Sequence, residues 1–177
     1  MTTCWFPDNT VLCNFAAVDR LPLLSAVLDG RGRWVEAVAA EAEASAAYYP
    51  ELRKVAADGW MGEPIQIAEL RDIELVESQR RAALGGRSDE PKKHLGEAQT
   101  CFVITEWAEF AGSWWITDDQ DALDYAHFKG ITSRETADLI GEAIACAFVT
   151  RADGYAILQR MVAAGRHLRV PAHASHL

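Results

Sequence analysis

The chain has 177 residues, 50% of them hydrophobic and 24% charged, which is typical of a globular protein with its own core. Its formal charge of -9 excludes a uniformly basic surface of the kind that binds nucleic acid nonspecifically. No apolar run approaches the roughly 20 residues of a membrane helix, and the N-terminus lacks the pattern of a secretory signal. We therefore expect a cytoplasmic protein that does not enter the membrane.

Short apolar runs alternate with helical patterns in the first half of the chain. The segment TCWF predicts a strand over residues 3–6, and Asn9 can cap the helix that follows. A second helix is expected over residues 21–28, and a second strand over Arg33 to Val35. Further along, the patterns predict helices over residues 36–49, 50–59 and 71–84, a strand over 64–70 and a loop over 85–93.

The second half continues the alternation. The patterns predict a helix over residues 94–110, a strand over 113–117, a helix over 119–127 and a short strand over 129–131. Two closing helices begin at capping signals, Thr132 with Glu135 and Thr150 with Asp153. The four cysteines lie in apolar segments without metal-binding spacing, so we expect reduced core residues.

Alternating strands and helices without hairpin signals predict a three-layer α/β/α sandwich with a central, mostly parallel sheet. We expect a single domain over residues 1–170, with a helical and strand insert at about 50–93. Residues 171–177 are expected to form a C-terminal tail.

Acidic residues follow the predicted strands. Asp8 comes after the first strand, and Asp118 and Asp119 come after a later one. Glu41 lies in the helix after the second strand, and Glu97 lies in the first turn of a later helix. Because the carboxyl ends of parallel strands share one edge of a sheet, these side chains are expected to converge there. Converging carboxylates repel one another unless they bind a cation, and hard oxygen ligands favour Mg²⁺ or Mn²⁺.

Each acid alone also has a structural explanation. Asp8 can be a turn or capping residue, and either Asp118 or Asp119 can cap the next helix. Glu97 can complement the dipole of its helix. Two neighbours compete with Glu41 for its position, namely Glu36 and Glu43.

The segments FPDNTVL, AVAAEAE, HLGEAQ and WITDDQDA, in this order, resemble the four acidic motifs of PIN domains, especially the VapC-like toxin ribonucleases. The resemblance covers most of the chain, including the closing helices. It implies a PIN-like fold with Thr10 as the polar residue that supports the first acid. The catalytic residues that it implies are Asp8, Glu41, Glu97 and Asp119, and the metal ligands are Asp8, Glu97, Asp119 and the adjacent candidate Asp118.

The resemblance further implies an endoribonuclease that needs Mg²⁺ or Mn²⁺ and leaves 5′-phosphate products. It implies the toxin of a toxin–antitoxin pair, with RNA as substrate and an antitoxin protein as partner. The apolar N-terminal helices suggest a homodimer or, equally, core packing. A PIN-like binding module with weak or no catalysis is the alternative function. Another metal-dependent phosphohydrolase is a weaker one, because the haloacid-dehalogenase type needs an acid where this chain has Thr10.

A basic cluster precedes Glu97. Its side chains can bind RNA phosphates or can simply form a solvated helix end and loop. The interspersed Asp89 and Glu90 favour the second interpretation. The cluster consists of Arg80, Arg81, Arg87, Lys92 and Lys93.

Overall fold

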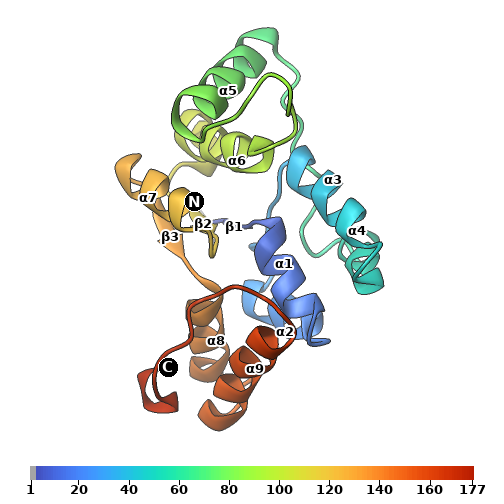
Figure 1. Cartoon of the computed structure of the whole chain (residues 1–177), viewed down its shortest axis with the longest axis vertical. Coiled ribbons are helices and arrows are strands. Elements are labelled where there is room, and N and C mark those ends of the chain that lie inside the picture. The colour runs from blue at the N-terminus through green and yellow to red at the C-terminus, as the bar shows by residue number, and fades with distance from the viewer. Residues whose placement is uncertain (1–2) are drawn as a thin grey trace.

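A computed structural model describes residues 3–177 as helices around a small three-stranded sheet (Figure 1). The strands are β1 (Trp5–Pro7), β2 (Trp114–Ile116) and β3 (Thr132–Arg134). All pairings are parallel and the spatial order is β1-β2-β3. The prediction of an α/β fold with a parallel sheet is confirmed.

Aromatic and cationic side chains pack against one another along the sheet. Trp5 pairs in register with Trp114, and their rings stack with centroids 4.7 Å apart. The Arg31 guanidinium lies 4.1 Å from the centre of the Trp5 ring, and that of Arg134 lies 4.8 Å from the centre of the Trp114 ring. These four side chains extend the contact across the sheet, which stabilises strands that are only three residues long.

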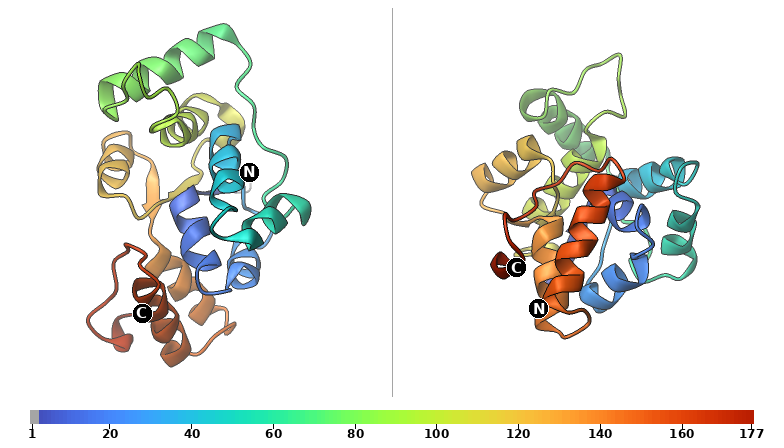
Figure 2. Two further views of the ribbon diagram at one scale, coloured as in Figure 1. Left: turned by 45° about the vertical axis from the view of Figure 1, so that its right-hand side comes forward. Right: turned by 60° about the horizontal axis from the view of Figure 1, so that its bottom comes forward.

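The helices surround the sheet. α5 and α6 lie at one end of the molecule and α8 and α9 at the other, with the strands between them (Figure 1). An extended segment rises along one side of the molecule from α4 to α5 (Figure 2). The α-helices are α1 (Asn9–Ala16), α2 (Leu21–Leu28), α3 (Glu36–Ser45), α4 (Arg53–Ala57), α5 (Leu70–Ala83), α6 (Leu95–Glu106), α7 (Gln120–Phe128), α8 (Thr136–Ala145) and α9 (Arg151–Ala163). Short 3-10 turns occupy Pro50–Leu52, Ala108–Phe110 and Ala174–His176.

One hydrophobic core connects the sheet to its helices. The cluster extends from Trp5 in β1 to Met161 in α9 and includes the fully buried Phe6, Phe15 and Trp115. Each such side chain contributes roughly 1.5–3 kcal/mol through removal of apolar surface from water. No helix within residues 3–177 has the length and apolarity needed to cross a membrane.

The prediction that all cysteines belong to the core is correct only in part. Cys13 and Cys101 are buried, and Cys4 is partly buried. Cys146 is exposed, because it lies at the end of α8, where the helix gives way to a surface turn.

Two of the predicted strands form only isolated bridges. Around Arg33 to Val35 the chain forms only single bridges, from Trp5 to Gly32 and from Val35 to Ile65. A longer ladder cannot form there, because α3 begins at the next residue. The segment 64–70 contributes only its Ile65 bridge before α5 begins.

The third strand lies later than predicted. Residues 129–131 form the turn that follows α7 instead, with Gly130 at φ +71° and the Ile131 amide donating to the Ala126 carbonyl. The strand then follows in the polar residues Thr132–Arg134. The prediction relied on the apolar side chain of Ile131, but this residue is buried in the turn before the strand.

The two capping predictions have different outcomes. Thr150 accepts a bond from the Asp153 amide, as predicted for the start of α9. Thr132 does not open α8, because it belongs to β3. A capping box of Glu135 and Asp138 does so instead.

Residues 171–177 lie against the last helix. Arg151 donates to the Ser175 carbonyl at 2.9 Å, and the Tyr155 hydroxyl donates to the Ala172 carbonyl at 3.3 Å. The domain boundaries and the insert at 50–93 stay predictions.

Candidate acidic site

Asp8 joins the first strand to α1 and is almost fully buried, with 8% of its surface exposed. It caps α1, because its Oδ1 accepts the Val11 amide at 2.8 Å. Asn9, the predicted cap, is the first residue of the helix. Burial raises the pKa of Asp8 from its ordinary 3.8 to about 7; two hydrogen bonds oppose the shift, and the charges of Asp118 and Glu97 add to it.

A buried hydroxyl fixes Asp8. The Thr117 hydroxyl donates to Asp8 Oδ2 at 2.5 Å and accepts the Asp119 amide at 3.2 Å. One side chain thus orients two acids from different elements. The supporting hydroxyl that the resemblance implied at Thr10 is supplied by Thr117, whereas the main-chain carbonyl of Thr10 faces Arg166 at 3.5 Å.

Asp118 links three elements. Its Oδ1 accepts the Thr136 amide at 3.0 Å, and its Oδ2 accepts both the Thr136 hydroxyl at 2.5 Å and the Asn14 amide group at 2.8 Å. Burial is the main cause that raises its pKa, and these bonds oppose the rise. Asp118 therefore holds the end of β2 against α1 and α8 in this structure.

Asp119 differs from its neighbour because it is exposed. It caps α7 through its Oδ1, which accepts the Ala122 amide at 2.9 Å. The second oxygen of the carboxylate makes no hydrogen bond within residues 3–177 and remains available to a ligand.

Glu41 and Glu97 face each other across α3 and α6. Burial raises the pKa of Glu41 from its ordinary 4.5 to about 7, the charge of Glu97 adds to this, and the Gly96 amide opposes it. A Cβ at Gly96 would lie 3.0 Å from Val38 Cγ2 and 3.1 Å from Glu41 Oε1. The helices approach closely here because residue 96 is a glycine.

The competing glutamates on α3 have other partners. Glu36 accepts a bond from Gln99 at 3.1 Å, and Glu43 is exposed and lies 3.6 Å from Arg53. Glu41 is the glutamate of α3 that lies beside Gly96 at the start of α6.

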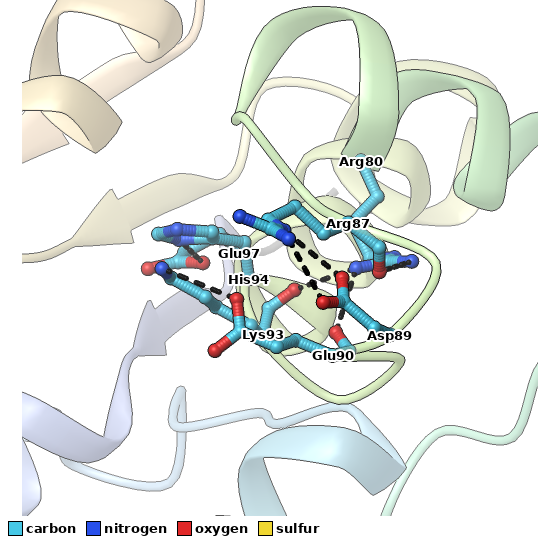
Figure 3. Close-up of polar contacts among 7 residues, drawn as sticks. All are labelled: Arg80, Arg87, Asp89, Glu90, Lys93, His94 and Glu97. Atoms are coloured by element: carbon cyan, nitrogen blue, oxygen red, sulfur yellow. Dashed lines mark hydrogen bonds and ion pairs between the residues drawn. The ribbon is translucent and has the colours of Figure 1, made fainter.

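His94 is a site residue that the sequence did not single out. It has a left-handed backbone, φ +59°, directly before α6, and its Nδ1 lies 2.9 Å from Glu97 Oε2 (Figure 3). Burial raises the pKa of Glu97, His94 lowers it, and the charge of Asp119 raises it further.

The loop before His94 is held by Arg80, which is fully buried. Its guanidinium donates at 3.1 Å to the main-chain carbonyls of Arg87, Glu90 and Lys93, and it forms an ion pair with Glu77 at 2.7 Å (Figure 3 shows all of these residues except Glu77). Arg80 thus shapes the loop that places His94 beside Glu97.

The rest of the basic cluster is largely neutralised. Arg87 pairs with Asp89 at 2.9 Å, Lys93 lies 3.6 Å from Glu90, and Arg81 pairs with Glu77 at 2.5 Å. These contacts support the interpretation as a solvated loop rather than an RNA-binding surface.

Arg80→Met is expected to lower the free energy of unfolding by about 2 kcal/mol, because three carbonyls lose their donor. The loop over residues 84–93 should become sensitive to trypsin. Thermal unfolding and limited proteolysis measure both effects. Arg81→Met is the matched control: it removes only an exposed ion pair and should cost under about 1 kcal/mol. Equal effects of the two substitutions would contradict a special role for Arg80.

The carboxylates form one electrostatic unit, here called the acidic cluster. Asp8 is influenced by Asp118 and Glu97, Glu41 by Glu97, and Glu97 by Asp119. Apart from His94 on Glu97, no cationic side chain within residues 3–177 pairs with a member. Across the same residues, no three His, Cys, Asp or Glu side chains are already gathered as a metal site. The acidic cluster consists of Asp8, Glu41, Glu97, Asp118 and Asp119.

A separate cavity of about 820 Å³ lies beside the turn between α8 and α9. Its lining includes Arg20, Phe148, Arg151 and Arg160 and none of the acidic cluster. It is therefore distinct from the acidic site.

Comparisons of the chain with models of protein families, with curated proteins and with solved structures give no significant match. The functional argument therefore depends on the acidic cluster itself.

Proposed function

We propose that the chain is a metal-dependent endoribonuclease with a PIN-like α/β/α fold that hydrolyses RNA phosphodiester bonds at the acidic cluster. One observation carries this proposal: a buried carboxylate, Asp8, and partly buried carboxylates from separate segments influence one another without lysine or arginine partners among residues 3–177. Buried uncompensated carboxylates are costly, and they are concentrated at functional sites. The resemblance of the four acidic motifs to PIN domains supports the same proposal.

The chemistry of the acidic cluster suits Mg²⁺ or Mn²⁺. Its donors are all hard carboxylate oxygens, which these ions prefer. Asp8, Glu97 and Asp119 would hold the ion, with Asp118 as an additional candidate. A bound ion supplies Lewis acidity, since it lowers the pKa of a water molecule and offsets charge on phosphoryl oxygens.

The protein's own groups have separate tasks in this scheme. Asp8 is held in one orientation by Thr117 and by the first turn of α1. Asp119 presents an exposed carboxylate at the start of α7, where a substrate can approach. Glu41, with a pKa of about 7, can orient the attacking water and accept its proton near neutral pH.

The biological role that we propose is that of a toxin in a toxin–antitoxin pair. This part depends on the resemblance, as does an antitoxin that covers the acidic cluster. A homodimer is proposed on the apolar N-terminal helices instead.

Cleavage of a panel of labelled RNAs tests the proposal. The wild type should cut RNA with Mg²⁺ or Mn²⁺ and not with EDTA. Glu41→Gln should lower the rate by about a hundredfold, because it removes the proton acceptor. The matched control is Glu43→Gln on the same helix, where the side chain is exposed, and it should cut normally. Absence of metal-dependent cleavage, together with no Mn²⁺ binding by calorimetry, would rule out the nuclease.

A second candidate is a PIN-like binding module without efficient catalysis. The contact of His94 with Glu97 favours it, because one proposed ligand already has a cationic partner when the imidazole is protonated. His94→Ala distinguishes the two functions: it should leave a nuclease able to bind Mn²⁺, whereas a pure binding module would bind none.

A further inference from the structure

Arg166 lies at the edge of the acidic cluster. It follows α9 directly, after Gly165 at φ +80°, and its amide donates to the Met161 carbonyl at 3.0 Å. Its Nε donates to Asn14 Oδ1 at 2.8 Å, and its Nη2 lies 3.5 Å from the Thr10 carbonyl. The end of α9 thus returns the chain to the first helix, 152 residues earlier.

Every described partner of Arg166 is neutral. Besides Asn14 and Thr10 it contacts Tyr49, whose ring centre lies 5.8 Å from the guanidinium carbon. Arg169, three residues later, forms an ion pair with Glu135 at 2.6 Å, but Arg166 has no carboxylate partner within residues 3–177. The chain has 26 acidic and 17 basic residues, so acidic partners are in excess. An arginine near acids that forms no ion pair therefore leaves its charge available to a ligand.

Asn14 explains how the arginine can lie so close to the acids without pairing with them. It is fully buried, its amide nitrogen donates to Asp118 Oδ2 at 2.8 Å, and its amide oxygen accepts from Arg166. A neutral side chain therefore separates the carboxylate from the guanidinium and fixes both. The charge of Arg166 is positioned but is not neutralised.

The thiol of Cys13 lies within reach of the charges of both Arg166 and the acidic cluster. Burial raises the pKa of its thiol, Arg166 lowers it, and Asp8 and Glu41 raise it. The thiol thus experiences the fields of both groups. This agrees with the geometry, in which Arg166 contacts Asn14 and the Thr10 carbonyl on α1, the helix that Asp8 caps.

An RNA strand approaching the acidic cluster carries negative charge into a negative region. A fixed guanidinium at the edge offsets that repulsion, and its unused N–H groups match the oxygens of a phosphate. We propose that Arg166 binds a backbone phosphate of the RNA and so guides the strand into the acidic cluster. This inference rests on the proposed function and names the residue that provides substrate affinity.

Fluorescence anisotropy tests the proposal with a labelled single-stranded RNA of mixed sequence, about a dozen nucleotides long. Binding is measured in EDTA, and again with Mg²⁺ in an Asp8→Asn background, so that cleavage does not interfere. Arg166→Gln should weaken binding about tenfold in both conditions. The slope of log Kd against log salt should fall by about 0.7, the value for one lost phosphate contact on a single strand.

Two further variants complete the test. Arg166→Lys keeps the charge without the planar fork and should weaken binding only a few-fold, and it serves as the measured variant if Arg166→Gln does not fold. Arg160→Gln is the matched control: this arginine lies on α9 in the separate cavity, and binding should be unchanged.

The outcomes separate this inference from the nuclease proposal. Unchanged affinity and salt slope in folded Arg166→Gln, or unchanged affinity in Arg166→Lys if Arg166→Gln does not fold, would overturn the inference even if the wild type cuts RNA. A lower cleavage rate with unchanged RNA affinity would also overturn it, since Arg166 would then only position Asn14 and Asp118. Arg166-dependent binding by a wild type that never cuts would uphold the inference and reject the nuclease.

Discussion

Asp8→Asn should abolish RNA cleavage and at the same time stabilise the protein at pH 8. The activity should fall by at least about a hundredfold, because the variant lacks the buried carboxylate proposed to hold the metal. The stability should rise because Asp8, with a pKa of about 7 against an ordinary 3.8, is ionised at pH 8 at a cost. A shift of about three units corresponds to roughly 4 kcal/mol at most.

The local structure should tolerate this substitution. Asparagine keeps an oxygen for the Val11 amide, and its amide group can donate to the Thr117 hydroxyl. At pH 5 the gain in stability should be less than half as large, because Asp8 is then protonated in the folded wild type and ionised only in the unfolded chain, and the gain should vanish only below about pH 4. Urea unfolding at both pH values measures the difference.

Asp29→Asn is the matched control. Asp29 is exposed at the end of α2 with φ +47°, a conformation that asparagine accepts. Neither activity nor the pH dependence should change. A variant Asp8→Asn that still cuts RNA, or that is equally destabilised at pH 5 and pH 8, would contradict the assigned role of Asp8.

The positions of two acids relative to the sheet were predictable because they follow from local pattern and topology. Asp8 and Asp118 were expected after strands at the carboxyl edge of a parallel sheet, and the structure places both there. Most helices were predicted near their observed ranges for a similar reason, since apolar periodicity is local. The strand over Thr132–Arg134 was missed because it is polar and obtains its stability from pairing with β2.

Other site residues could not be predicted from local pattern. Thr117 looks like an ordinary strand residue until its hydroxyl is seen between Asp8 and Asp119. Arg166 reaches Asn14 only because α9 folds back along the molecule. His94 depends on a loop that is shaped by a buried arginine, and a charged residue in a helix pattern is normally expected to be exposed. Such contacts arise from tertiary packing.

Without metal, the protein should lose stability as the pH rises from about 4 to about 7. Asp8 and Glu41 have folded-state pKa values raised to about 7, so their contribution is complete below their ordinary values and is lost as pH passes through 7. Glu77 acts oppositely. Arg80 and Arg81 hold its pKa at about 2, so its contribution is lost only as the pH falls toward 2.

Mg²⁺ or Mn²⁺ should reverse the loss at neutral and higher pH, because the ion binds the ionised carboxylates and replaces their protons. At a metal concentration about 100-fold above Kd, the gain should be about 2.7 kcal/mol, or roughly 5–10 °C in Tm for a chain of this size. At pH 5 the same concentration should have little effect, because protons occupy Asp8 and Glu41. Thermal scans with and without metal at pH 5 and pH 8 measure this, with Asp8→Asn as the control that should not respond. An equal shift at both pH values would place the ion elsewhere on this acidic protein, and no shift at pH 8 would favour the binding module, since the acidic cluster would then hold its charge without a metal.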